Sequence, residues 1–204
     1  TVFGWLDRAA IARVPQQLRG HQLQHGLHVN QMGFRAGLSD TTLSLAILEM
    51  WHVARDRGLM MVHIAVDLTD AFPMTLESEA VAALLAAGAP IEGSRFRLAI
   101  GSGCNIVVSA GPHTSKPRRI GDGMKAGRKG CPLAFAAYSA ELLDKLGEAV
   151  ATATCFGGIV EGFAAASADD LSICAITGFR GVAVLFRRVS EAFQKWHSLG
   201  FPTA

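Results

Sequence analysis

The chain has 204 residues with a formal net charge of +2; half of the residues are apolar and 18% are charged. This length can bury a sizeable core, and the 22 glycines and seven prolines follow no period, so the composition excludes collagen-like, low-complexity and disordered chains. No stretch reaches the roughly 18 consecutive apolar residues of a membrane-spanning helix, and no membrane partner is expected.

The first part of the chain predicts one clear helix. Residues 1–35 are polar and irregular, which indicates short helices on the outside of the fold. Between Thr42 and Arg57 apolar residues recur at helical spacing, and Gly58 ends the pattern. Ser39 or Asp40 can serve as the N-cap. The positions expected to face the core are Leu43, Ile47, Met50, Trp51 and Ala54.

The next elements are a strand and a second helix. The apolar run Met61–Val66 is rich in β-forming residues and predicts a buried strand that ends at Asp67. Thr75 can cap the helix that follows, and Gly88 and Pro90 stop it. The residues of this helix expected to face the core are Val81, Leu84 and Leu85.

A hairpin and a third helix are predicted in the middle of the chain. Residues 95–100 and 104–110 flank a Gly-Ser-Gly turn, which is typical of a β-hairpin. Pro132 suits the first turn of a helix that continues to about Val150. The residues of this helix available to the core are Ala136, Ala140, Leu143 and Leu146.

The last elements are two strands and a helix. Residues 159–167 and 171–177 predict strands joined at Ala168-Asp169-Asp170. The apolar stripe of the final helix, which Gly200 closes, is Val182, Phe186, Val189, Phe193 and Trp196. The order of elements predicts an α+β fold: a split-βαβ, ferredoxin-like antiparallel sheet with helices on one face.

A basic segment and the cysteines bear on partners and compartment. Six Lys or Arg residues but only one acid lie between Lys116 and Gly130, which is typical of a solvated loop and less often of a phosphate contact. The four cysteines are far apart and form no CxxC pair, which favours a reducing intracellular compartment, organellar or nuclear, over a secreted disulfide framework. His21, His25 and His28 lack accompanying ligands, so metal binding there is the weaker interpretation.

Three acids stand at strand ends. Asp67 ends the first strand, and Asp169 and Asp170 occupy the turn between the last two. If those strands are neighbours, the acids meet and repel one another unless a cation neutralises them. Mg²⁺ does so through carboxylate oxygens and supports phosphoryl transfer. The alternative is that Asp-Asp is ordinary turn chemistry and that Asp67 caps a loop.

Five segments follow one another in an order typical of one family. They are Asn30–Ser39 (NQMGFRAGLS), Val66–Phe72 (VDLTDAF), Arg128–Leu133 (RKGCPL), Ser167–Asp170 (SADD) and Trp196–Phe201 (WHSLGF). The first four resemble the Q-x-G-F-R-x-G-x-S, D-x-x-x-A-F, R-Q-G-x-P-L and Y-A-D-D motifs of reverse transcriptases, of the non-LTR retroelement or group II intron type. The fifth resembles the helix end that follows the Y-A-D-D turn. The resemblance spans almost the whole chain.

The resemblance implies a polymerase palm with partial fingers in a single domain. Residues 1–60 would form partial fingers, and residues 61–204 the palm with a hairpin insertion near 95–110. No thumb is expected, since the chain stops where the primer-grip hairpin and thumb should begin. The activity implied is RNA-directed DNA polymerase, a nucleotidyltransferase that acts with two Mg²⁺ ions.

The resemblance also implies roles for individual residues. Asp67 and Asp169 would hold Mg²⁺, and Asp170 would complete the catalytic set. Residues that would contact nucleotide or template are Phe72, Arg35, Arg128, Lys129, Gly130 and Pro132; for Phe72, simple packing is an equal alternative. Residues that would contact phosphates are Lys116, Arg118, Arg119 and Lys125. The partners implied are RNA or an RNA–DNA duplex.

The chain departs from the family at several positions. Lys129 stands where the family has glutamine, and Ser167 stands where it has an aromatic residue. Pro73 replaces an acid, and Ala134-Phe135 replaces Ser-Pro. Two hypotheses follow. The first is that the chain is the catalytic core of a polymerase, either a fragment or one piece of a split enzyme whose other protein subunits supply a thumb. The second is that it is a catalytically silent, domesticated RNA-binding subunit of a ribonucleoprotein such as a mitochondrial ribosome. A two-metal hydrolase is a weaker third.

Overall fold

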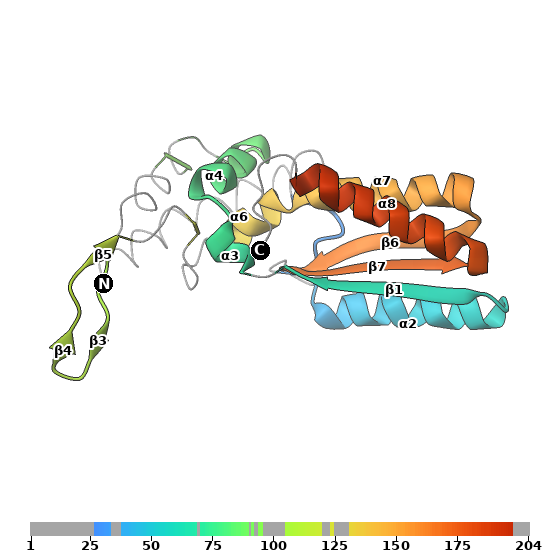
Figure 1. The fold of residues 1–204 in the computed structure, drawn as a ribbon, viewed down its shortest axis with the longest axis horizontal. Helices are drawn as coiled ribbons and strands as arrows, with labels where there is room; N and C mark the ends of the chain where they lie inside the picture. The colour runs from blue at the N-terminus through green and yellow to red at the C-terminus, as the bar shows by residue number, and fades with distance from the viewer. Residues whose placement is uncertain are drawn as a thin grey trace. The chain divides into compact units, whose positions relative to one another are not determined.

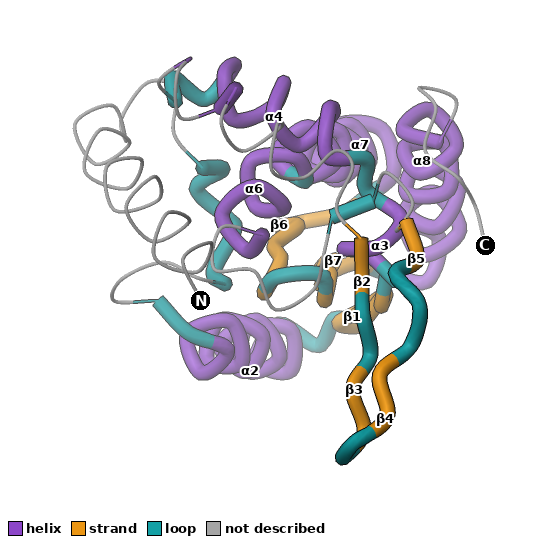
Figure 2. The backbone as a smooth tube through the Cα atoms, turned by 90° about the vertical axis from the view of Figure 1, so that its left-hand side faces the viewer, coloured by secondary structure: helices purple, strands orange, loops and turns teal. Residues whose placement is uncertain are grey.

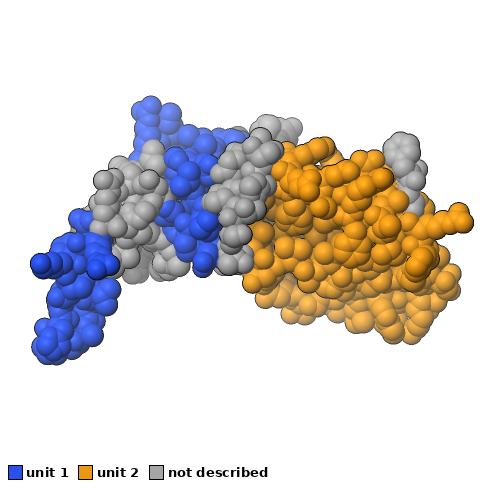
Figure 3. All heavy atoms as spheres, in the orientation of Figure 1, with its two compact units in different colours: residues 1–26, 70–138 blue, residues 27–69, 139–204 orange. Residues whose placement is uncertain are grey.

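The structure, a computed structural model, has the predicted α+β class (Figure 1). It describes residues 27–33, 38–68, 70–89, 91, 94–95, 105–119, 123–124 and 131–197. The chain divides into two compact units (Figure 3). Unit 1 comprises Thr1–Gly26 and Asp70–Tyr138, and unit 2 comprises Leu27–Thr69 and Ser139–Ala204. The assignment of these parts to fingers and palm stays a prediction.

Unit 2 contains a three-stranded antiparallel sheet. Its strands are β1 (Met60–Asp67), β6 (Ile159–Ser167) and β7 (Asp170–Thr177), in the order β1-β7-β6. The predicted adjacency of the first strand and the last strand is therefore confirmed. The prediction that β1 is buried is wrong, because β1 lies at the sheet edge and alternates between exposed and half-buried residues.

Helices cover both faces of this sheet. Figure 1 shows α7 (Ala140–Gly157) and α8 (Phe179–His197) on one face and α2 (Asp40–Asp56) on the other. The prediction of helices on one face is therefore wrong. The cause lies in β7: Ile173 and Ala175 pack with α7 and α8, whereas Cys174 and Ile176 pack with α2. A central strand that is apolar at consecutive positions needs cover on both sides.

Helix α2 begins and ends close to where its sequence predicts. The Ser39 backbone N–H donates to the Thr42 hydroxyl (3.3 Å), and Gly58 follows the helix with φ 62°. Leu43, Met50 and Ala54 are buried as predicted. Trp51 is half exposed instead, with the Arg55 guanidinium 5.3 Å from its ring centroid.

Helix α8 follows the predicted stripe except at Phe186, where the neighbouring Leu185 is buried instead. Leu185, Val189 and Ala192 are buried, whereas Phe186 is 52% exposed. Phe193 and Trp196 pack at the margin of the core as predicted. The helix thus packs Leu185, Val189 and Ala192 into the core that it shares with α7, and leaves Phe186 largely exposed.

The predicted third helix is two helices. Helix α6 (Cys131–Tyr138) ends in unit 1, and α7 begins in unit 2 after Ser139, which stands at its N-cap. Pro132 lies in the first turn of α6, as predicted. The core positions Ala136, Leu143 and Leu146 are buried as predicted, and Ala140 is half-buried.

Unit 1 is built on α3 (Ala71–Met74), α4 (Glu77–Ala86) and α6. Val81 and Leu84 of α4 are buried as predicted, but Leu85 is 38% exposed. Thr75 does not cap α4: its hydroxyl donates to the carbonyl of Ala71 (2.7 Å), and Leu76 stands at the N-cap. Gly88 follows the helix with φ 88°.

Unit 1 also carries a two-part hairpin, which we call the basic arm (residues 105–119; Figure 2). Strand β2 (Asn105–Ile106) pairs with β5 (Arg118–Arg119), and β3 (Ser109–Ala110) pairs with β4 (His113–Thr114). The described residues of the predicted strand at 104–110 thus pair with residues that follow them in the chain. Most of the proposed partner segment 95–100 lies outside the described residues.

Within the described residues, no helix is both long enough and apolar enough to cross a membrane.

Candidate functional site

Two of the three predicted acids lie directly opposite each other at one end of the unit 2 sheet. In the register of β1 and β7, Asp67 is the partner of Asp170, and both residues are exposed. Opposed residues of an antiparallel pair have Cβ atoms about 4.5–5.5 Å apart, and like charges there are destabilising. The pairing therefore concentrates negative charge where a ligand can reach it.

The third acid, Asp169, lies in the turn between β6 and β7. Because Ser167 pairs with Asp170, the turn contains only Ala168 and Asp169. Ala168 has φ 60°, and Asp169 is not among the described residues with positive φ, so positive φ is confined to the first of the two turn residues. A left-handed conformation costs an alanine about 1–2 kcal/mol, so the surrounding structure must stabilise it.

The buried side chain of Gln31 provides that stabilisation. Its Oε1 accepts hydrogen bonds from the backbone N–H of Ala168 and of Gly33, both at 3.0 Å. Its Nε2 donates to the carbonyl of Ala168 (3.1 Å) and to the hydroxyl of Ser139 (3.3 Å). Gln31 is 0% exposed, so these bonds form away from water.

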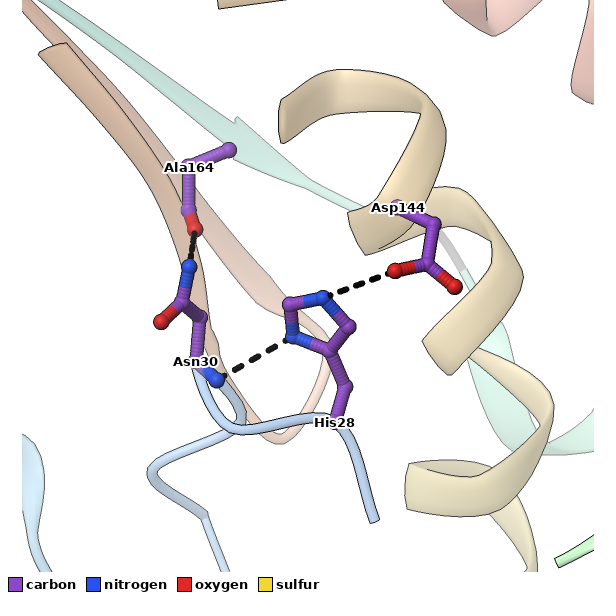
Figure 4. A network of polar contacts seen from close by, with 4 residues as sticks. All are labelled: His28, Asn30, Asp144 and Ala164. Carbon is purple, nitrogen blue, oxygen red and sulfur yellow. Dashed lines mark hydrogen bonds and ion pairs between the residues drawn. The ribbon is translucent and has the colours of Figure 1, made fainter. Parts of the chain in front are cut away.

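The segment around Gln31 is anchored along the edge of β6. The backbone of Asn30 and Met32 exchanges two hydrogen bonds with Ala166 (2.9 and 2.7 Å). The Asn30 side chain donates to the carbonyl of Ala164 (2.8 Å), and its backbone N–H donates to His28 Nδ1 (3.1 Å; Figure 4). His28 Nε2 lies 3.1 Å from the Asp144 carboxylate, so the ring is used for structure and not as a metal ligand.

A fourth acid lies beside the turn. Asp40, the first residue of α2, accepts a hydrogen bond from the Ser167 hydroxyl. The sequence suggests Asp40 only as a possible cap. Ser167 thus forms a hydrogen bond to α2. It stands where the Y-A-D-D motif has an aromatic residue.

The donor set suits a hard divalent cation that shares its shell with a substrate. Among the described residues, no three His, Cys, Asp or Glu side chains are arranged to hold a metal by themselves. Mg²⁺ usually binds through one or two carboxylates and completes its shell with water and substrate phosphates. The oxygen pair of Asp67 and Asp170, next to Asp169, fits that mode better than it fits a closed structural site.

A nearby thiol takes no part in such a site. Cys174 lies on β7, four residues from Asp170, and is fully buried between the sheet and α2. Burial raises the pKa of Cys174 from 9.0 to about 12. The thiol is therefore protonated and unreactive at neutral pH, since only the thiolate is a good ligand or nucleophile.

Four of the other predicted site residues are described in unit 1. Phe72 is half-buried and packs on Phe135 with a centroid distance of 5.0 Å. This contact supports its packing role and leaves a sugar contact a prediction. Lys116 and Arg118 are exposed on the basic arm, and Pro132 starts α6. For Arg119 only the backbone, in β5, is described. The predicted residues outside the described part are Arg35, Lys125, Arg128, Lys129 and Gly130.

The sequence indicates no role for two residues that shape the site, Gln31 and Ser139, and indicates only a capping role for Asp40. Gln31 lies in a quoted motif, but only Arg35 of that motif was given a function. The one sequence feature that points to Gln31 is the nearby Gly33. A glycine in an irregular segment suggests that the backbone there lies close to another part of the chain. A Cβ on Gly33 would overlap the backbone nitrogen of Ala168 and lie 3.0 Å from its Cα.

Comparison with protein-family models found no matching family. Comparison with curated proteins found no similar sequence. The features that indicate a function are the turn Ser167–Asp170, which we call the acidic turn, and the basic arm.

Proposed function

We propose that the chain is a reverse-transcriptase-like, nucleic-acid-binding palm domain, whose acidic turn binds Mg²⁺ for nucleotidyl transfer to a primer. The opposition of Asp67 and Asp170 across β1 and β7, with Asp169 in the adjoining turn, is the observation that carries the proposal. These acids occupy the positions of the two acidic motifs of the resemblance.

The site residues divide the chemistry among them. Bound Mg²⁺ ions supply charge neutralisation at the triphosphate and activation of the primer 3′-hydroxyl. Asp67 and Asp169 would hold the ions, and Asp170 would add charge from the position opposite Asp67. On β1, Asp67 is exposed at the end of the strand, where a substrate can reach its carboxylate.

The basic arm supports a nucleic acid as the partner. Residues 107–118 are all exposed, and they include Lys116 and Arg118 but no acid. The acid-free stretch runs from Gly93 to Gly121. Phosphate contacts from such residues are independent of sequence and weaken as salt concentration rises.

Primer extension tests the catalytic proposal. The assay offers the purified chain an RNA template, a DNA primer, nucleoside triphosphates and Mg²⁺, alone and with a candidate thumb-bearing partner protein. We expect extension that falls to background in Asp67→Asn and in Asp169→Asn. A matched control is Glu148→Gln, which removes an exposed acid from α7 and should leave extension unchanged. Extension that survives both aspartate changes would exclude this site.

A second candidate function is that of a catalytically silent RNA-binding subunit of a ribonucleoprotein. The observation that favours it is the basic arm, which has no core of its own, since a lone two-stranded ribbon is marginally stable without a partner. In this function the arm would bind RNA whether or not the acidic turn holds a cation.

Salt-dependent RNA binding tests this second function. The double variant Lys116→Gln/Arg118→Gln should lower the slope of log affinity against log salt by about 1.4, or roughly 0.7 for each contact to single-stranded RNA. Arg180→Gln removes an exposed charge from α8 and is the matched control. RNA binding without any extension, and with an unchanged slope in Asp67→Asn, would favour the silent subunit. If the double variant kept the wild-type slope, the basic arm would be excluded as the RNA-binding surface.

A further inference from the structure

Gln31 contacts the backbone on both sides of Ala168. It accepts from the N–H of Ala168 and donates to the C=O of the same residue. These two groups belong to the peptide planes before and after the Ala168 Cα, so holding both planes determines its φ and ψ. The contact spans 137 residues of sequence. No local interaction within the two-residue turn can replace it.

Gly33 makes this contact possible. The Gly33 N–H donates to the same Gln31 oxygen (3.0 Å), which orients the amide. The absence of a side chain on Gly33 allows its backbone to lie against Ser167 and Ala168. We call Gln31 and Gly33 together the turn clamp.

Asp169 and Asp170 are the next residues after the clamped alanine. The conformation of Ala168 sets the direction in which the chain leaves the turn, and hence where the Asp169 carboxylate lies. Asp170 is held opposite Asp67 by the ladder of β1 and β7. A rotation of either peptide plane would move Asp169 while the ladder of β1 and β7 stayed intact. The clamp therefore acts on the turn more than on the sheet.

We propose that Gln31 is a positioning residue: with Gly33 it sets the conformation of the Ala168–Asp169 turn, and through it the placement of Asp169 beside the Asp67–Asp170 pair, where a divalent cation binds. The second part of this inference rests on the proposed function. Gln31 does not touch the cation or substrate in this proposal. Its effect passes through Ala168.

The test uses Mn²⁺ as the probe, followed by electron paramagnetic resonance, together with amide hydrogen exchange at Ala168. Gln31→Met keeps the length of the side chain and removes all its hydrogen bonds. Exchange at Ala168 should accelerate by about tenfold or more, because the N–H loses its acceptor. The Mn²⁺ dissociation constant should rise by about 10- to 100-fold, as is usual when a group that orients a metal ligand is lost.

Asn30→Leu is the matched control. It removes a side-chain hydrogen bond from the same segment to Ala164 of β6, but leaves the turn contacts in place. Exchange at Ala168 and Mn²⁺ affinity should stay close to wild type, although global stability falls. If Gln31→Met does not fold, Gln31→Asn, which keeps the amide but shortens the side chain, is measured in its place.

A rescue variant separates positioning from general stability. In Gln31→Met/Ala168→Gly the turn residue can adopt positive φ without a clamp. Mn²⁺ affinity should recover by about tenfold relative to Gln31→Met. A loss that came only from a damaged core would not respond to a glycine in a distant turn.

The outcomes distinguish the inference from the proposed function. If wild-type protein binds no Mn²⁺, the proposed function fails, and exchange at Ala168 alone decides whether the clamp exists. If Gln31→Met and Asn30→Leu show the same exchange and the same Mn²⁺ affinity, the positioning role is overturned.

Discussion

Two hairpins in the described part of the chain have two-residue turns that begin with a positive φ, but the two turns are stabilised in different ways. In the basic arm, Ala110 pairs with His113 around a two-residue turn whose first residue, Gly111, has φ 59°. In unit 2, Ser167 pairs with Asp170 around a turn whose first residue, Ala168, has φ 60°. Glycine accepts this conformation without strain, whereas alanine requires the contacts of Gln31.

The difference separates a locally determined turn from one that depends on tertiary structure. The arm turn is exposed, and its conformation follows from glycine alone. The acidic turn exists only when residues 31–33 and 167–170 meet, so its geometry is coupled to the folding of unit 2. A site that must place carboxylates accurately benefits from this second arrangement, because buried hydrogen bonds restrict the turn more than local preference does.

The largest effect is expected from Gly33→Ala. The new Cβ would overlap the Ala168 backbone, so we expect a loss of about 3 kcal/mol in the free energy of unfolding, at the upper end for overpacking. Urea denaturation measures it. Gly147→Ala is the control: it lies in α7 with open space around it and should stabilise the protein by about 0.5–1 kcal/mol. Equal effects at the two glycines would contradict the close approach.

Cys174 reports whether the sheet behind the acidic turn is dry. Its folded pKa of about 12 lies above the ordinary 9.0, so the folded state holds the proton more tightly. The stability from the protonated thiol is complete below pH 9 and is lost as the pH rises toward 12. Relative to Cys174→Ala, wild-type protein should lose about 1.4 kcal/mol of unfolding free energy per pH unit there. If the unfolding free energies of the two proteins changed with pH in parallel, the thiol would be accessible to water.

Exchanging the turn residues tests the comparison directly. Ala168→Gly should stabilise unit 2 by about 0.5–1 kcal/mol, because it removes left-handed strain at some cost in chain entropy. The reciprocal Gly111→Ala should open the arm turn, seen as faster amide exchange at residues 109–114, without changing the denaturation midpoint. If Ala168→Gly destabilises the protein, the alanine methyl contributes packing that outweighs the strain.

The smallest effect is expected at the acidic pair. Without divalent cations, Asp67→Asn should stabilise the protein by about 0.5 kcal/mol, since it removes repulsion from Asp170. Addition of Mg²⁺ should stabilise wild-type protein more than the variant. Thermal denaturation with and without Mg²⁺ measures both. A variant less stable than wild type without the cation would mean that the two charges do not repel at this register.

Much of unit 2 could be predicted from local patterns. The bounds of β6 and β7 follow from apolar runs on either side of Ala168-Asp169-Asp170, and the start of α2 follows from Ser39. The adjacency of Asp67 and Asp170 was also predicted, because a split-βαβ order makes β1 and β7 neighbours. These features are encoded by residues close in sequence or by topology.

Other features could not be predicted because they depend on which surfaces meet. The packing of α8 against α7 buries Leu185 and leaves Phe186 exposed. The break at Ser139 lies inside a run of good helix formers, and the Ser139 hydroxyl contacts Gln31. The need for helices on both faces of the sheet follows from the central position of β7, which only the strand order reveals.

The residue pattern by itself determined the three strands of the unit 2 sheet, most of the helices and the presence of three acids at strand ends, since periodicity and turn chemistry act over a few neighbouring residues. Tertiary structure alone decided how the acidic turn is held: the alanine with φ 60° and the Gln31 amide that bonds to it are 137 residues apart. Hydrogen bonds between such distant groups leave no periodic trace in the sequence, because they depend on the positions of atoms that only the folded chain brings together.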